Sequence, residues 1–232
     1  MHFGYFDPTY ILVIIGIVLT LAASAKVKST FAKYSRVGSR SGMTGAQVAE
    51  RLLHDAGIYD VYIERASGNL TDHYDPKNKV LRLSDPVYGQ TSLAAIGVAA
   101  HECGHAIQHQ NSYAPLGIRS ALVPVANIGS MAAWPLIILG LVLSYNEVLI
   151  YLGIILFGAA VLFQIITLPV EFDASKRAIT KLGETRILQD DELRQSKKVL
   201  DAAALTYVAA AAATILQLLR LVILFGGGRS RD

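Results

Sequence analysis

Four long stretches of the chain are almost free of charged residues, and two polar regions separate them. The stretches cover residues 8–25, 120–144, 148–170 and 205–225. Each is close to the roughly 20 apolar residues that a helix needs to cross a bilayer. The pattern predicts an α-helical membrane protein with about four transmembrane helices. Gln217 and Arg220 interrupt the fourth stretch, which therefore either spans or lies in the interface.

The residues next to the first three stretches indicate how these stretches cross the membrane. A small-residue segment before Lys26 resembles a signal cleavage site, but no Lys or Arg precedes the first stretch. Signal peptides begin with a basic region, so we interpret residues 8–25 as a retained anchor. The second and third stretches are separated by residues 145–147 alone, which predicts a tight helical hairpin.

Basic residues concentrate on one side of the predicted membrane. Residues 1–9 and 144–147 contain none, whereas five closely follow the first stretch: Lys26, Lys28, Lys33, Arg36 and Arg40. The positive-inside rule then places polar regions 26–116 and 171–204 in the cytoplasm and the amino terminus outside. These cations also favour contact with anionic lipid headgroups of the bilayer. The net charge is only +3 without a basic stripe, so no nucleic-acid partner is expected.

Within region 26–116 the pattern predicts two helices around a small sheet. Residues 44–56 have amphipathic spacing, with Thr44 and Gln47 placed as a capping box and Gly57 as the stop. Residues 61–83 alternate in the manner of a small antiparallel sheet, with a turn at 75–78. A second helix runs from its cap Ser92 to about Asn111.

The second helix carries the chemistry, in the segment His101-Glu102-Cys103-Gly104-His105. Residues four apart share a helix face about 5–6 Å apart, so the two imidazoles can bind one Zn²⁺. Glu102 lies about 100° around the helix. There it can act as the general base that takes a proton from a zinc-activated water. The pattern predicts a zinc peptidase, with one Zn²⁺ per chain as cofactor.

The single cysteine of the chain lies inside this segment. A Cys beside a His is also a weak signature of a thiol protease. Cys103 lies two positions from His101, about 200° around the helix, so it faces away from the imidazoles. We interpret it as a packed residue.

A catalytic zinc site needs a third protein ligand. His109 lies eight positions from His101, about 12 Å along the helix, and cannot share the ion; it is expected near the helix exit or the cleft. Glu171 is the best candidate, because the hairpin returns the chain to the leaflet that it left. Asp173 is the rival ligand, or a residue that orients a ligand imidazole.

Four separated blocks of the sequence carry a family resemblance. They are Leu70–Pro76, Lys79–Ser84, Ala99–His109 and Val170–Ala178. In these blocks the chain resembles the YugP-like family of bacterial neutral zinc metallopeptidases, and the match runs through nearly the whole chain. That family is similar in plan to the membrane gluzincins of the HtpX and CAAX-prenyl endopeptidase type.

The resemblance implies a zincin-like α+β catalytic domain. It matches Glu171 to the third ligand, in a block that reads E-aromatic-x-A-D in the related proteins. Ser175 departs from the final Asp of that block, and Asp173 is the candidate substitute.

The same plan implies that an exposed strand binds the substrate in extended form, either residues 80–84 or residues 70–74. His73 and Tyr74 would then lie near the zinc and stabilise the oxyanion, with Arg177 as a weaker candidate.

These expectations describe a zinc metalloendopeptidase of the bacterial cytoplasmic membrane that hydrolyses membrane or membrane-proximal proteins. Two alternatives come from other classes. A scaffold with a structural zinc site would usually hold four ligands, often with Cys. A transporter would show intramembrane polar sites and inverted repeats. The apolar stretches offer only Gln164, Gln217 and Arg220 as polar sites, and the sequence shows no clear inverted repeat.

Overall fold

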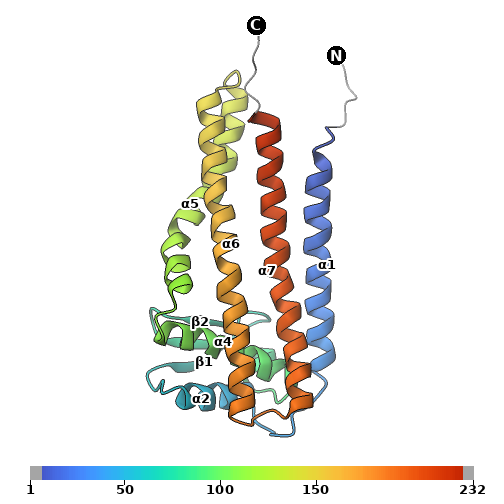
Figure 1. The fold of residues 1–232 in the computed structure, drawn as a ribbon, viewed down its shortest axis with the longest axis vertical. Coiled ribbons are helices and arrows are strands. Elements are labelled where there is room, and N and C mark those ends of the chain that lie inside the picture. The colour runs from blue at the N-terminus through green and yellow to red at the C-terminus, as the bar shows by residue number, and fades with distance from the viewer. Residues whose placement is uncertain (1–6, 227–232) are drawn as a thin grey trace. The chain divides into compact units, whose positions relative to one another are not determined.

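The computed structural model describes residues 7–226 and divides into two compact units. We call Met1–Ala23, Gly117–Leu168 and Thr206–Asp232 the apolar unit, and Ser24–Leu116 with Pro169–Leu205 the polar unit. Four long helices contribute residues to both: α1 (Tyr10–Tyr34), α5 (Ala114–Val142), α6 (Glu147–Glu184) and α7 (Asp190–Phe225) (Figure 1).

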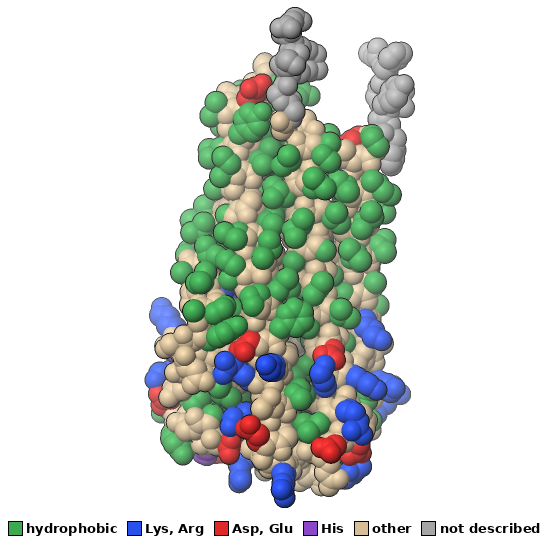
Figure 2. All heavy atoms as spheres, in the orientation of Figure 1, with side chains coloured by type: hydrophobic (Ala, Val, Ile, Leu, Met, Phe, Trp, Pro, Cys, Tyr) green, Lys and Arg blue, Asp and Glu red, His purple; other side chains and the backbone are tan. Residues whose placement is uncertain are grey.

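All four long helices contain a window apolar and long enough to cross a membrane, and at most 28% of such a window is buried. On the face shown in Figure 2, hydrophobic side chains cover the apolar unit, and Lys, Arg, Asp and Glu gather over the polar unit. A soluble protein rarely exposes contiguous apolar patches of this extent. Length, composition and exposure together indicate a membrane protein.

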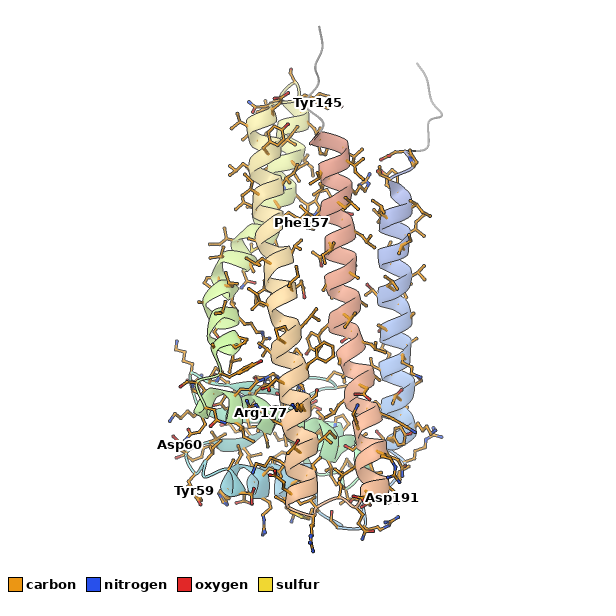
Figure 3. All side chains as sticks on the ribbon, viewed as in Figure 1. Tyr59, Asp60, Tyr145, Phe157, Arg177 and Asp191 are labelled. Atoms are coloured by element: carbon orange, nitrogen blue, oxygen red, sulfur yellow. The ribbon has the colours of Figure 1, made fainter. Side chains whose placement is uncertain are left out.

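In the apolar unit, α5 and α6 form the expected tight hairpin. Ser144 and Tyr145 both have positive φ, 55° and 60°, and the backbone N–H of Asn146 donates to the carbonyl of Gly140 at 2.8 Å. The rings of Trp134 and Phe157 pack edge to face across the pair at 6.4 Å; Phe157 is labelled in Figure 3. The helices approach closely along the hairpin, because a methyl group on Gly129 would lie 2.6 Å from a carbonyl of α6.

The ends of α1 and α7 in the apolar unit also meet. Gly16 of α1 lies against Ala213 of α7, where an added Cβ would be 3.1 Å from the alanine methyl. The Arg220 guanidinium lies over the Tyr10 ring at 4.2 Å and donates to Asp7 at 3.3 Å. The interrupted fourth stretch is therefore part of one continuous helix, and its arginine has a partner.

The polar unit contains the shorter elements: α2 (Gly45–Asp55), β1 (Tyr62–Ala66), β2 (His73–Asp75), β3 (Val80–Ser84), α3 (Asp85–Tyr88) and α4 (Leu93–Gln110). The predicted capping box of α2 is confirmed, with both the Thr44 and the Gln47 bonds present. Ser92 caps α4 by accepting from the Ala95 N–H at 3.2 Å. Both helices thus begin where their side-chain caps replace missing backbone partners.

The sheet differs from the prediction. Its strand order is β1-β3-β2, with β1 and β3 parallel and β2 and β3 antiparallel. It is therefore mixed rather than antiparallel, and residues 80–84 form the central strand instead of an exposed edge. Leu70 was predicted in a strand but adopts a positive φ of 59° before β2 begins. Alternation of apolar and polar residues predicts which segments are strands, but the order of strands in a sheet depends on tertiary packing. Four of the five β3 residues are buried, which suits a central strand.

The core of the polar unit gathers around α4. Its fully buried side chains come from α2, β3 and α4, and include Leu52, Leu81, Leu83, Leu93 and Ile96. Burying one such side chain contributes about 1.5–3 kcal/mol. Leu182 of α6 and Leu188 after it join the same cluster, so this core holds α6 residues against the helix that carries His101.

Candidate metal centre

The candidate centre depends on a close approach of two helices within the polar unit. Gly104 of α4 faces the backbone of α6, where an added Cβ would lie 2.4 Å from the carbonyl oxygen of Ala174. No real Cβ tolerates such a distance from a backbone atom. Glycine at this position therefore allows residues 171–175 of α6 to lie directly beside α4, as the sequence suggested.

Three potential metal ligands converge at this approach. His101 Nε2 lies 3.2 Å from Glu171 Oε2, and His105 Nε2 lies 3.6 Å from the same oxygen. The ligand atoms of the three residues all lie within 4.8 Å of one another. Zinc bonds of about 2.0–2.2 Å to nitrogen and oxygen fit inside such a triangle. The donor set of two imidazoles and one carboxylate suits a catalytic zinc ion.

The remaining imidazole nitrogens are also engaged, which fixes the direction of each ring. His101 Nδ1 bonds the Ser175 hydroxyl at 3.0 Å, and His105 Nδ1 bonds Gln108 Oε1 at 3.0 Å. An Nδ1–H that donates in this way leaves Nε2 free as a metal ligand and increases its basicity. Both rings are therefore set with Nε2 toward Glu171.

Gln108, which bonds His105, also makes hydrogen bonds to α6. Gln108 is fully buried, and its Nε2 donates to the Val170 carbonyl and to Asp173 Oδ2, both at 2.8 Å. Arg177 donates to the same Asp173 oxygen at 2.5 Å. Asp173 is thus linked to His105 through the Gln108 side chain, and it is not one of the three residues whose ligand atoms converge. Arg177, labelled in Figure 3, also covers the Tyr113 ring at 5.6 Å.

Burial and nearby carboxylates have opposite effects on the pKa of His105. Burial alone would lower the pKa of this imidazole, but the Glu171 hydrogen bond and the charges of Glu102 and Glu171 raise it above its usual value. In the metal-free protein the ring therefore tends to bind a proton in the place that a metal ion would take.

Glu102 is 7% exposed and lies on α4 between the two histidines. Within residues 7–226 its carboxylate makes no hydrogen bond or ion pair with another residue. Its neighbour Cys103 is fully buried, and its thiol contacts the Ala49 carbonyl at 3.6 Å. Burial and the Glu102 charge raise the pKa of this thiol, which agrees with a packed residue and not a nucleophile.

The other predicted residues lie around β2. The Tyr74 hydroxyl bonds His109 Nδ1 at 2.9 Å, and so ties the strand to the end of α4. Burial and the charges of Asp60 and Asp75 raise the pKa of Tyr74 to about 12, so its phenol stays protonated and can donate. His73 instead bonds the Thr71 carbonyl at 2.8 Å and Arg82. In this arrangement the Tyr74 hydroxyl shares a hydrogen bond with His109 of α4, and His73 is occupied elsewhere.

Sequence reasoning missed Gln108 and the role of Ser175. A signal existed for both. Residues 101, 105 and 108 follow the i, i+4, i+7 spacing of one helix face, and Ser175 lies one turn after Glu171. The contacts of Gln108 and Ser175 depend on which residues of α6 lie opposite α4. The sequence of either helix alone does not predict this pairing.

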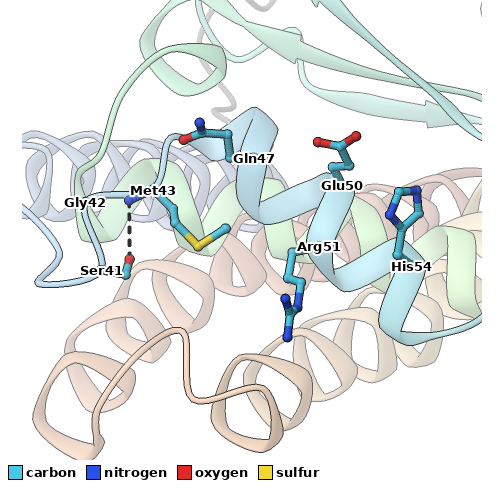
Figure 4. A pocket seen from close by; sticks show the side chains of 7 residues that line it. All are labelled: Ser41, Gly42, Met43, Gln47, Glu50, Arg51 and His54. Carbon is cyan, nitrogen blue, oxygen red and sulfur yellow. Dashed lines mark hydrogen bonds between the residues drawn. The ribbon is translucent and has the colours of Figure 1, made fainter.

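Another hollow of the polar unit lies apart from this cluster. Seven residues around α2 line a space of about 500 Å³ (Figure 4): Ser41, Gly42, Met43, Gln47, Glu50, Arg51 and His54. None of them belongs to the two-histidine, one-glutamate group. The hollow contains a single histidine and a single carboxylate, which do not make a metal site.

Fold and site together define a membrane protein with a potential metal centre of two histidines and one glutamate. The chain belongs to the family described as "Putative neutral zinc metallopeptidase", whose profile matches residues 9–226. It is 51% identical over 221 residues to a protein of Bacillus subtilis (strain 168) named "Putative membrane protease YugP". The alignment covers 95% of this chain and 98% of that protein. No solved structure matches the chain.

Proposed function

We propose that the protein is a membrane zinc metalloendopeptidase of the gluzincin type, with a zincin-like catalytic domain in its polar unit. The convergence of His101, His105 and Glu171 within 4.8 Å carries the proposal. Glu171 follows His105 by 66 positions, so no local helix spacing explains the encounter. Family membership and the membrane protease name of the relative support the same class.

The three side chains would hold one zinc ion, since their donor types and spacing fit it. Bound there, zinc would supply a Lewis acid that lowers the pKa of a water molecule and polarises a peptide carbonyl. Ser175 and Gln108 hold the two imidazoles in the orientation that binding requires. Three protein ligands would leave the fourth coordination position of the zinc ion open for a water molecule.

Glu102 would act as general base and then as general acid. Its carboxylate accepts one proton from the attacking water, while the water oxygen bonds to the carbonyl carbon of the substrate. The same proton would then pass to the amide nitrogen as the C–N bond breaks, which gives a carboxylic acid and an amine; the acid then transfers its own proton to the amine, so the final products are a carboxylate and an ammonium group. Glu102 is buried and lies between the two histidines in the sequence of α4, which supports this role.

Substrates of this site would be membrane proteins or membrane-proximal segments. The four apolar helices confine the protein to a bilayer, so substrates in the same bilayer meet it most often. Basic residues after the first apolar stretch favour a cytoplasmic position for the polar unit. Tyr74 lies beside α4 at the edge of the sheet, and its hydroxyl could donate to the substrate oxyanion when His109 Nδ1 is the donor in their shared bond.

Zinc content and proteolysis, measured on the same preparations, test the proposal. The detergent-purified wild type is compared with Glu102→Gln, Glu171→Ala and the matched control Glu184→Ala. Glu184 lies on the same helix, exposed, and pairs with Lys181. Casein serves as an unstructured substrate, and zinc is measured by mass spectrometry.

Wild type, control and Glu102→Gln should each hold about one zinc per chain, whereas Glu171→Ala should be depleted. Cleavage should persist only in wild type and control. Full zinc occupancy in Glu171→Ala would remove that residue as a ligand and leave Asp173 as the rival. Cleavage that survives in Glu102→Gln would refute the assigned base.

A further inference from the structure

A groove in the polar unit brings lysines from two helices together. It has a volume of about 450 Å³ between the carboxyl-terminal part of α1 and the early part of α7. Lys26 and Lys33 line it from α1, and Lys198 lines it from α7. Thr30 and Tyr34 add hydroxyl groups to the α1 side. None of these residues belongs to the metal centre.

Each wall of the groove is one regular helix face. The α1 positions 26, 30 and 33, and the α7 positions 198, 202 and 205, repeat at i, i+4 and i+7. The groove therefore follows the two helices along about two turns of each. Lys26 and Lys33 are then spaced about 10 Å along α1, which suits several anionic oxygens better than one small ion.

The two helices that line the groove are packed against each other. Tyr34 of α1 is 5% exposed and Val199 of α7 is 1% exposed, and both belong to one cluster with Ala94 of α4. This cluster fixes the two helix faces against each other within the polar unit. The lysine positions are thus built into the fold, although their ammonium groups remain in solvent.

The groove carries unbalanced positive charge. Asp201 also lines it, but Lys197 donates to both oxygens of that carboxylate at 2.7 Å. Within residues 7–226 no ion pair is recorded for Lys26, Lys33 or Lys198. The Lys33 ammonium lies over the ring of Tyr34, another residue that lines the groove, at 5.3 Å.

The groove also marks where charge ends along both helices. No charged residue lies in α1 before Lys26, and Arg220 is the only one in α7 after Asp201. Leu205, the groove residue nearest the apolar run of α7, is 47% exposed. A ligand there would meet ammonium groups at one end and apolar surface at the other.

We propose that this groove binds the headgroup of an anionic phospholipid. The three ammonium groups would bind the phosphate oxygens, the two hydroxyls would add hydrogen bonds, and an acyl chain would lie along the apolar end. Lysine is a compact charge that binds phosphate without fixed geometry, and basic pockets between membrane helices recognise such headgroups. A soluble phosphate shares the charge but not the apolar part of the site.

Native mass spectrometry of the delipidated full-length protein in neutral detergent tests the proposal without relying on catalysis. Phosphatidylglycerol, phosphatidylcholine and inorganic phosphate are titrated separately. The groove variant replaces Lys26, Lys33 and Lys198 by Gln. The control removes the same charge from exposed residues near the same helix ends but outside the groove: Lys28, Arg36 and Arg194 by Gln. Circular dichroism and retained zinc verify folding of both variants.

Wild type and control should bind one phosphatidylglycerol and little phosphatidylcholine. Each neutralised lysine weakens binding about fivefold, so the groove variant should lose about one-hundredfold. Replacing the three lysines by Arg should restore most of the binding. Equal losses in groove variant and control would overturn the proposal, because they indicate diffuse attraction only. Displacement of the lipid by millimolar inorganic phosphate would overturn it too, because it assigns the groove to a soluble anion.

Discussion

The carbonyl oxygen of Ala174 lies where Gly104 would carry a side chain, at 2.4 Å from the position of a Cβ. Alanine in an exposed helix interior stabilises by about 1 kcal/mol relative to glycine. Here the clash is with backbone and α6 must move, which costs about 1–3 kcal/mol. Gly104→Ala should therefore lower the melting temperature and the zinc affinity together, as thermal unfolding and chelator competition would measure.

Gly158 provides the control for that change. It is helical in α6, and nothing lies within 4 Å of an added Cβ. Gly158→Ala should leave zinc affinity unchanged and stability equal or slightly higher. If both alanine variants bound zinc as tightly as wild type, close approach at Gly104 would be irrelevant to the site.

Gln108 should prove to be a positioning residue for His105. Gln108→Leu keeps the volume but leaves His105 Nδ1, Asp173 and the Val170 carbonyl without their shared partner. Loss of such a supporting bond typically weakens metal affinity about 10–100-fold. The matched control Gln110→Leu changes an exposed residue of the same helix. Zinc affinity of Gln108→Leu within twofold of the control would contradict the assignment.

Ser175 should act on His101 in a comparable way. Ser175→Ala removes the hydroxyl that His101 Nδ1 bonds at 3.0 Å, and zinc affinity should fall about tenfold or more. Ser175→Asp installs an acceptor at the same position and should restore binding, since a carboxylate is a common partner of a zinc-ligand imidazole. Isothermal titration with zinc separates the two. Equal affinity in all three proteins would show that the hydroxyl has no part in orienting the ring.

Acid should release zinc early. Zinc binds neutral imidazole, and the pKa of His105 is raised in the metal-free protein by Glu171 and Glu102 against the effect of burial. Affinity should thus begin to fall above the ordinary imidazole pKa of about 6.5. The metal-free protein should respond oppositely. The charged ring stabilises its fold at low pH, and this contribution is lost as pH rises through the raised pKa.

Chelator competition and thermal unfolding between about pH 5 and 8 check both signs. A zinc affinity independent of pH would contradict competition between proton and metal. A metal-free melting temperature that rises with pH through this window would contradict the sign assigned to His105.

The Arg220–Asp7 contact should stabilise the apolar unit. Arg220→Gln leaves Asp7 and the Tyr10 ring without the guanidinium, and should cost about 1–3 kcal/mol. Asp7→Asn and the double variant complete a cycle that isolates the pair. Additive losses in thermal unfolding would mean that the two residues do not interact.

Local signals accounted for much of what the sequence predicted. The caps of α2 and α4 are properties of adjacent residues, so Thr44 and Ser92 were sufficient to place both helices. The pairing of β1 with β3 is a property of distant segments and was predicted wrongly. For the site, helix spacing alone related His101 to His105. Gln108 and the role of Ser175 were missed because the contacts of both residues exist only where α4 meets α6.

The distance along the chain between His105 and Glu171 sets an order of events during biosynthesis. Two apolar stretches, residues 120–144 and 148–170, leave the ribosome before Glu171 does. A nascent chain that ends before Glu171 carries the histidine pair without its third ligand, and should bind zinc weakly. The proposed site would thus stay incomplete until both stretches of the hairpin have been synthesised, so the third ligand and the membrane hairpin become available together.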